Sequence, residues 1–110
     1  MCLHALDVWV RDAGVLTDLA RVRATLYAGA RAGGATVLGE EFCVFPNGAV
    51  TGVLVLAQSH LSIHTWPELS LANVDLLSYG DVSGTDVLRV VCDGLDAERT
   101  SLTSIPRAIG

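Results

Sequence analysis

The sequence predicts an α+β fold, a two-layer α/β sandwich in which an antiparallel sheet carries two helices on one face. Two observations lead to this prediction. Two segments space their apolar residues at intervals of three and four, which indicates helices, and five other segments show the apolar runs typical of strands. The resulting order is β-α-β-β-β-α-β, in a single domain over residues 1–110, and it implies that both helices pack on one side of the sheet.

The first two elements are a strand and a helix. Residues 3–10 alternate loosely and predict the strand. A helical pattern then opens at Asp12 and ends at Gly33-Gly34, since glycine commonly follows the last turn of a helix. Within it, apolar residues recur on one face (Val15, Leu19, Val22 and Leu26).

Two further strands follow. Residues 35–45 predict the first, and residues 46–49, which read PNGA, predict a turn. Residues 50–58, VTGVLVLAQ, predict the second. Because this run is almost entirely apolar, we expect it to be central and buried on both faces.

The last elements are a strand, a helix and a weaker strand. Residues 73–79, NVDLLSY, predict the strand. Ser83 then caps a helix, with Asp86 at the capping-box position. Residues 99–105, RTSLTSI, predict the final strand. One face of such a sheet remains open to a partner subunit or a ligand.

Composition narrows the classes of function. Of the 110 residues, 51% are hydrophobic and only 17% are charged, which indicates a buried surface beyond one small core and therefore a homodimer or higher homo-oligomer. The net charge is -5 with no basic run, so we expect no nucleic-acid partner.

Cysteine usage and hydropathy predict the location of the protein. Cys2, Cys43 and Cys92 have no zinc-ligand spacing, and an odd number gives no complete disulfide framework. No stretch approaches the roughly 20 apolar residues of a membrane span. The first residues, MCLHALDVWVRD, contain an acid and no basic lead, which is atypical of a signal peptide. We therefore expect a cytoplasmic protein that does not bind membranes.

The segment AQSHLSIHTWPE, residues 57–68, places unusual chemistry directly after an apolar strand. On a helix, His60 and His64 would lie over one metal ion, but Thr65, Trp66 and Pro67 disfavour a helix. On a strand the two are about 13 Å apart, too far to bind one ion together. We expect no metal site.

Other interpretations of this segment remain open from the residues alone. Ser59 and His64 can be a nucleophile and its base, although there is no GxSxG motif. Alternatively, Ser59 and His60 simply end a strand and bind its last backbone groups. We expect His4 to be structural, and Trp66-Pro67 to serve packing and turn rigidity.

SHLSIHTWPE, followed by VDLLSYGD, closely resembles the prokaryotic S-adenosylmethionine decarboxylases. Members of that family read E-S-H-hydrophobic-[ST]-I-H-T-W-P-E and then D-hydrophobic-F-T-C-G. GATVLGEEF and GAVTGVLVLAQSH match the strands that lead into the site, so the resemblance covers nearly the whole chain.

The resemblance implies that the chain cleaves itself between Gln58 and Ser59, giving a β chain of residues 1–58 and an α chain of residues 59–110. The serine hydroxyl attacks the preceding carbonyl, and elimination and hydrolysis then leave a pyruvoyl group in place of Ser59. That covalent cofactor forms a Schiff base with the amine of the substrate, implied to be S-adenosylmethionine, and withdraws electrons as the carboxylate leaves. The decarboxylated product would feed the synthesis of spermidine and other polyamines.

The resemblance also implies roles for single residues. His64 assists processing, and Thr51 supports it from a position where the family usually has serine. Phe45 and Leu61 sandwich the adenine of the substrate, and Glu68 binds the ribose hydroxyls. The active sites lie between two protomers.

Two departures from the family pattern leave alternatives open. Gln58 replaces the usual glutamate, and Tyr79 replaces the cysteine that returns a proton to the decarboxylated carbon. Tyr79 is a weaker acid than cysteine and bulkier. The chain therefore decarboxylates S-adenosylmethionine with Tyr79 as donor, or takes L-arginine or L-ornithine, or is an unprocessed non-catalytic homologue.

Overall fold

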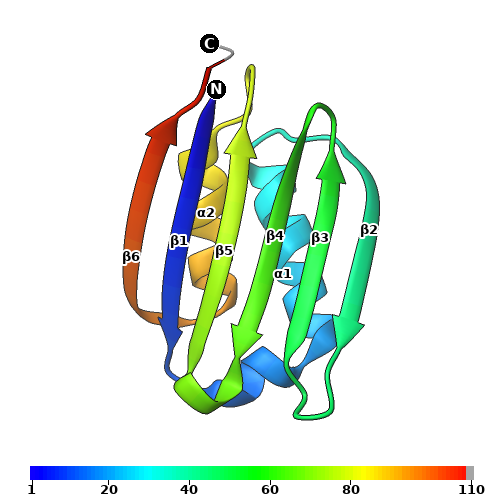
Figure 1. Ribbon diagram of the computed structural model, residues 1–110, viewed down its shortest axis with the longest axis vertical. Helices are drawn as coiled ribbons and strands as arrows, with labels where there is room; N and C mark the ends of the chain where they lie inside the picture. Colours follow the sequence, from blue (N-terminus) through cyan, green and yellow to red (C-terminus); the bar gives the residue numbers. More distant parts are fainter. Residues whose placement is uncertain (109–110) are drawn as a thin grey trace.

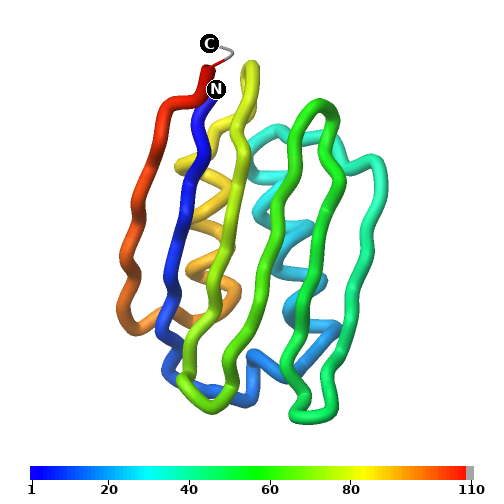
Figure 2. Tube along the Cα trace, viewed as in Figure 1, coloured from blue at the N-terminus to red at the C-terminus, as the bar shows by residue number. Residues whose placement is uncertain are grey.

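A six-stranded antiparallel sheet with two helices on one face forms the structure, a computed structural model that describes residues 1–108 (Figure 1). The sheet order is β2-β3-β4-β5-β1-β6. The first and last strands of the chain pair with each other, as the tube trace shows (Figure 2). The predicted two-layer α+β architecture is confirmed. The strands are β1 (Cys2–Val10), β2 (Val37–Val44), β3 (Val50–Leu56), β4 (Ser59–Trp66), β5 (Leu71–Ser78) and β6 (Ala97–Pro106).

The helices are α1 (Leu19–Ala32) and α2 (Gly84–Gly94), with short 3₁₀ helices η1 (Ala13–Thr17) and η2 (Pro67–Leu69). The helix predicted from Asp12 is wrong at its start, because two aspartates divide the segment. Asp12 accepts a hydrogen bond from the amide of Gly14 and caps η1, whereas Asp18 accepts one from the amide of Arg21 and caps α1. Ser83 caps α2 through the amide of Asp86, as predicted. No helix within residues 1–108 has both the length and the apolar character to cross a bilayer.

The prediction of five strands is wrong, because the histidine-rich segment is itself strand β4. The predicted third strand ends at Leu56, and Ala57 and Gln58 make a two-residue turn into β4. The polar residues His60, Ser62 and His64 alternate with buried Leu61 and Ile63 along this strand. Polar side chains every second residue are compatible with a central strand that has one open face.

The two faces of the sheet differ in burial. The face toward the helices forms the core, with side chains that are at most 2% exposed along the four inner strands β3, β4, β5 and β1 (Val50, Leu54, Leu56, Leu61, Ile63, Ala72, Val74, Leu76 and Val8). The other face is open, and Val55 of β3 is 49% exposed there. The prediction that this strand is buried on both faces is therefore wrong for the single chain.

Thr65 joins β4 to the segment before α1. It is fully buried, its hydroxyl donates to the carbonyl of Leu16 at 2.8 Å, and the same oxygen accepts from the amide of Val50 at 2.8 Å. Leaving such buried groups unpaired costs about 1–3 kcal/mol. These two bonds therefore hold the end of β4 in place, next to the residues described below.

Candidate active site

Thr51 and His64 lie opposite each other on β3 and β4, with both side chains on the open face. The Thr51 hydroxyl lies 2.6 Å from Nδ1 of His64. The ring of Phe45 packs edge-on against the imidazole with the ring centres 5.9 Å apart, and Trp66 does so at 4.3 Å. Two aromatic rings and one hydroxyl thus fix the orientation of His64.

Trp66 belongs to this cluster, which corrects the expectation that it only packs and stiffens a turn. It is 39% exposed on the open face, and its indole N–H donates to Oδ1 of Asn73 at 2.6 Å. The amide of Asn73 in turn donates to Asp7 at 2.8 Å. Sequence reasoning missed Asn73 and Asp7. Only the strand register, which aligns Asp7 with Asn73 and Asn73 with His64, brings them into one row.

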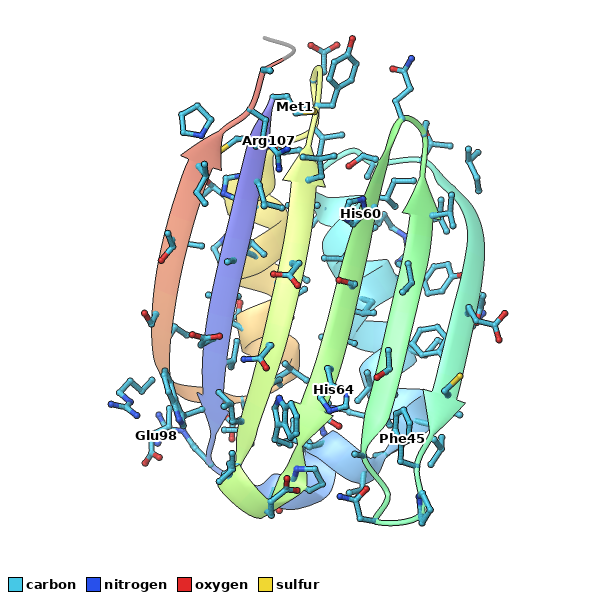
Figure 3. The ribbon with its side chains drawn as sticks, viewed as in Figure 1. Met1, Phe45, His60, His64, Glu98 and Arg107 are labelled. Atoms are coloured by element: carbon cyan, nitrogen blue, oxygen red, sulfur yellow. The ribbon has the colours of Figure 1, made fainter. Side chains whose placement is uncertain are left out.

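Phe45 and Glu68 complete this part of the open face. Phe45 follows β2 and is 44% exposed, while Glu68 lies in η2 and is exposed. We call Phe45, Thr51, His64 and Glu68 the histidine end of the sheet. In Figure 3, the labelled Phe45 and His64 lie toward one end, and His60 lies nearer the other.

The predicted cleavage site lies at the opposite end of β4. Gln58 has a φ of 61°, a left-handed conformation that costs a residue with a side chain roughly 1–2 kcal/mol. The hydroxyl oxygen of Ser59 is buried, and it has no hydrogen-bond partner among residues 1–108. Tyr79 follows β5 at the same end and is 37% exposed. We call Gln58, Ser59 and Tyr79 the cleavage end.

Within one chain, the histidine end and the cleavage end are apart. Ser59 and His64 are five residues apart on β4, a distance of about 16 Å along an extended strand. Their side chains also point to opposite faces, because Ser59 shares the face of Leu61 and Ile63. His64 therefore does not reach Ser59 of its own chain in this conformation.

Leu61 has a different position from the one that the resemblance implied. Its side chain is fully buried on the helical side of β4, in the core. A ligand on the open face does not reach it. We therefore assign Leu61 to the core and not to an adenine-binding pair.

The Ser59 hydroxyl fits the precursor of a pyruvoyl group. A buried hydroxyl without a partner usually costs free energy and therefore calls for a chemical explanation. Here the hydroxyl belongs to the residue whose amide would be cleaved, next to a backbone in a left-handed conformation. An unengaged hydroxyl is free to attack the carbonyl of Gln58.

His60 and His64 share the open face, but four residues separate them on an extended strand. No group of three metal-ligating side chains occurs within residues 1–108.

The chain is similar to known proteins in sequence and in fold. The family model described as S-adenosylmethionine decarboxylase matches residues 3–108. A curated relative from Caldanaerobacter subterraneus subsp. tengcongensis, an S-adenosylmethionine decarboxylase proenzyme, is 36% identical over 94% of this chain and 84% of its own length. The proenzyme of Methanococcus maripaludis is 35% identical over 94% and 86%.

The chain is shorter than some relatives but shares the fold of a solved structure. The chain spans only 59% of the length of the Pseudomonas aeruginosa proenzyme, to which it is 36% identical. The crystal structure of the adenosylmethionine decarboxylase from Aquifex aeolicus superposes with a TM-score of 0.87 at 28% identity, covering 100% of this chain and 92% of the other.

Proposed function

This chain belongs to the S-adenosylmethionine decarboxylase family, and we propose that it is a pyruvoyl-dependent decarboxylase that cleaves its own backbone between Gln58 and Ser59. The observation that carries the proposal is the buried Ser59 hydroxyl, which has no hydrogen-bond partner among residues 1–108 and lies beside the left-handed Gln58. The name proenzyme, borne by the relatives, supports processing of the same kind.

The pyruvoyl group, once formed from Ser59, supplies an electron-withdrawing carbonyl for the loss of a carboxylate from an amino-acid substrate. The residues of the chain orient the substrate and move protons. Phe45 offers an exposed ring to a flat base, and the exposed Glu68 offers a carboxylate to hydroxyl groups. Both features suit the nucleoside part of S-adenosylmethionine.

We propose that two copies of the chain assemble each active site. The separation of Ser59 from His64 supports this, because residues about 16 Å apart on opposite faces do not act on one substrate. Exposed apolar side chains on the open face, such as Val55 and Trp66, provide surface for a second copy. In such a homodimer, the cleavage end of one copy meets the histidine end of the other.

Tyr79 bears on the choice of substrate. It lies at the cleavage end, so its hydroxyl is available to return a proton to the decarboxylated carbon. We propose this role together with S-adenosylmethionine as substrate.

Intact mass of the purified protein tests the proposal first. We expect two fragments that separate before residue 59, the second with a ketone that reacts with hydrazides, whereas Ser59→Ala stays whole. Carbon dioxide release is then measured with S-adenosylmethionine, L-arginine and L-ornithine. A chain that stays whole contradicts self-cleavage, and release from arginine or ornithine alone contradicts the substrate.

A further inference from the structure

Ser78 lies beside Ser59 on the neighbouring strand. His60 pairs with Leu77, so the next position in this antiparallel register sets Ser59 opposite Ser78. Both side chains point to the helical face, because Leu61 and Leu76, each two residues away along the same strand, are buried there. Directly opposed residues have Cα atoms about 4.5–5.5 Å apart. The Ser59 hydroxyl has no hydrogen-bond partner among residues 1–108, so a contact with Ser78 requires a change of side-chain rotamer.

His4 on β1 binds Ser78 from the other side. Its Nε2 lies 3.1 Å from the Ser78 hydroxyl, and its Nδ1 lies 2.8 Å from the hydroxyl of Ser104 on β6. A side chain at Gly84 would place Cβ only 2.6 Å from Nε2 of His4, so glycine there is what allows helix α2 to begin so close to the imidazole. Ser59, Ser78, His4 and Ser104 thus form a row across four strands.

The surroundings of His4 favour its neutral form. Partial burial lowers its pKa. The amino-terminal end of α2 starts beside the ring and carries positive partial charge. The groups of α2 that line the cavity next to His4 include the cation Arg89 and the thiol Cys92, while β6 contributes only Thr100, Leu102 and Ser104. In the structure the Ser78 hydroxyl donates to the carbonyl of Cys2 at 3.3 Å. A neutral imidazole that donates from Nδ1 to Ser104 leaves Nε2 free to accept from Ser78 when that hydroxyl turns from Cys2 toward the ring.

We propose that Ser78 accepts the proton of the Ser59 hydroxyl during self-cleavage, and that His4 is the positioning residue that receives the proton from Ser78. This inference rests on the proposed self-cleavage and adds to it. The bond from Ser59 Oγ to the carbonyl carbon of Gln58 forms, and the Gln58–Ser59 amide bond breaks. The hydroxyl proton passes through Ser78 to His4 and returns to the leaving nitrogen, so this rearrangement to an ester needs no other reactant.

The inference assigns His4 and His64 to different steps of self-cleavage. His4 and Ser78 act within one chain on the shift of the acyl group from nitrogen to oxygen. His64, which does not reach Ser59 of its own chain, serves the later elimination from a second copy. Variants of the two sets therefore stop at different chemical stages, an amide in one case and an ester in the other.

The experiment measures the rate of precursor cleavage by intact mass in wild type and in Ser78→Ala, His4→Ala and His4→Asn. Thr100→Ala is the matched control, because Thr100 lines the same cavity without a hydrogen bond to His4. We expect cleavage to slow by tenfold or more in the three variants and by less than twofold in the control. Hydroxylamine, which cleaves esters and not amides, should release no fragment from their uncleaved chains.

Two readouts separate this role from a structural one. The wild-type rate should fall as the pH drops through the pKa of His4, and His4→Asn should lose that dependence. Imidazole should speed up cleavage of His4→Ala, whose missing ring opens onto a cavity of about 280 Å³, and not of Ser78→Ala.

Three results would overturn the inference. Cleavage of Ser78→Ala and His4→Asn within twofold of wild type refutes it, while self-cleavage itself stands. Slower cleavage with an unchanged pH profile and no response to imidazole assigns the pair to folding only. A wild-type chain that never cleaves overturns self-cleavage and this inference together.

Discussion

The Thr51 hydroxyl lies 2.6 Å from Nδ1 of His64, across the β3–β4 pair. The contact determines which nitrogen of the imidazole is available to accept a proton. When Nδ1–H donates to the Thr51 oxygen, Nε2 is left without a hydrogen and can accept a proton. Threonine therefore keeps the hydroxyl group that the family's usual serine would supply, and its methyl group does not prevent the contact.

We predict that Thr51→Val slows complete processing by about tenfold or more. Valine has nearly the same shape but cannot accept from Nδ1, and a donor left unpaired costs about 1–3 kcal/mol, which corresponds to roughly 5- to 150-fold in rate. Thr51→Ser keeps the hydroxyl and should process within about threefold of wild type. Time courses of intact mass measure both, and equal rates for valine and serine would show that the contact is not used.

Assembly of the site from two copies predicts complementation. Ser59→Ala lacks the attacking hydroxyl, and His64→Ala lacks the imidazole, so neither should process fully alone. When the two are co-expressed with different tags, mixed dimers contain one complete pair. We expect the chain with His64→Ala, and only that chain, to be cut and to carry the ketone. Persistence of both chains uncut in a verified mixed dimer would mean that the site forms within one chain.

The sequence predicts most of the fold because its apolar spacing is regular. Helix α2, with its Ser83 cap and buried Val87 and Leu88, lies where predicted. Strand β4 was missed because the positions on its open face are polar, and local propensity does not tell an open strand face from a functional loop. The break before α1 was missed because Asp18 caps a helix only when its neighbours leave the helical conformation.

The candidate site was predicted only in part, because the sequence does not reveal how the strands pair or which face each side chain takes. The motif selects Thr51 and His64, and the structure places the Thr51 hydroxyl 2.6 Å from Nδ1 of His64. The same motif does not show to which face of the sheet each side chain points. Leu61 was therefore predicted to contact the adenine, although the period-two alternation of the strand places it in the core. The row that joins His4 to Ser78 depends on pairing between residues 74 positions apart, which no local pattern contains.

Tyr79 is expected to limit the rate of decarboxylation and not of self-cleavage. Tyr79→Cys restores the family's proton donor, whose reference pKa of about 8.5 lies well below that of tyrosine at about 10. We expect the variant to release carbon dioxide from S-adenosylmethionine several times faster at pH 8, with cleavage unchanged. Tyr79→Phe, the matched control, should process normally and turn over at least tenfold more slowly. A Tyr79→Phe protein with wild-type turnover would remove Tyr79 from the reaction.

Glu40 should stabilise the fold above pH 4.5. Hydrogen bonds from Arg23 at 2.6 Å and from Tyr27 at 2.7 Å lower the pKa of its carboxyl from 4.5 to about 2. A carboxyl whose pKa is lower in the folded state contributes stability above its unfolded pKa and loses it as the pH falls through the folded value. The difference in Tm between wild type and Glu40→Gln should thus be constant above pH 5 and shrink between pH 4.5 and 2. Glu41→Gln, an exposed neighbour on the other face, should show no such trend.

Gln58 should be replaceable by glycine with a gain in stability of the uncut chain. Its φ of 61° costs roughly 1–2 kcal/mol, which glycine avoids, whereas the added freedom of glycine in the unfolded chain costs about 0.4–1 kcal/mol. In a Ser59→Ala background, which keeps the backbone whole, we expect Gln58→Gly to raise the free energy of unfolding by about 0.5–1 kcal/mol in urea titrations. Ala57→Gly, at the adjacent residue, which has no positive φ, should lower the free energy of unfolding. If both glycines lower the free energy of unfolding equally, the left-handed turn is not strained. The Ser59 hydroxyl, without a hydrogen-bond partner in the described part of the chain, is then the only one of the two features that distinguishes the bond to be cleaved.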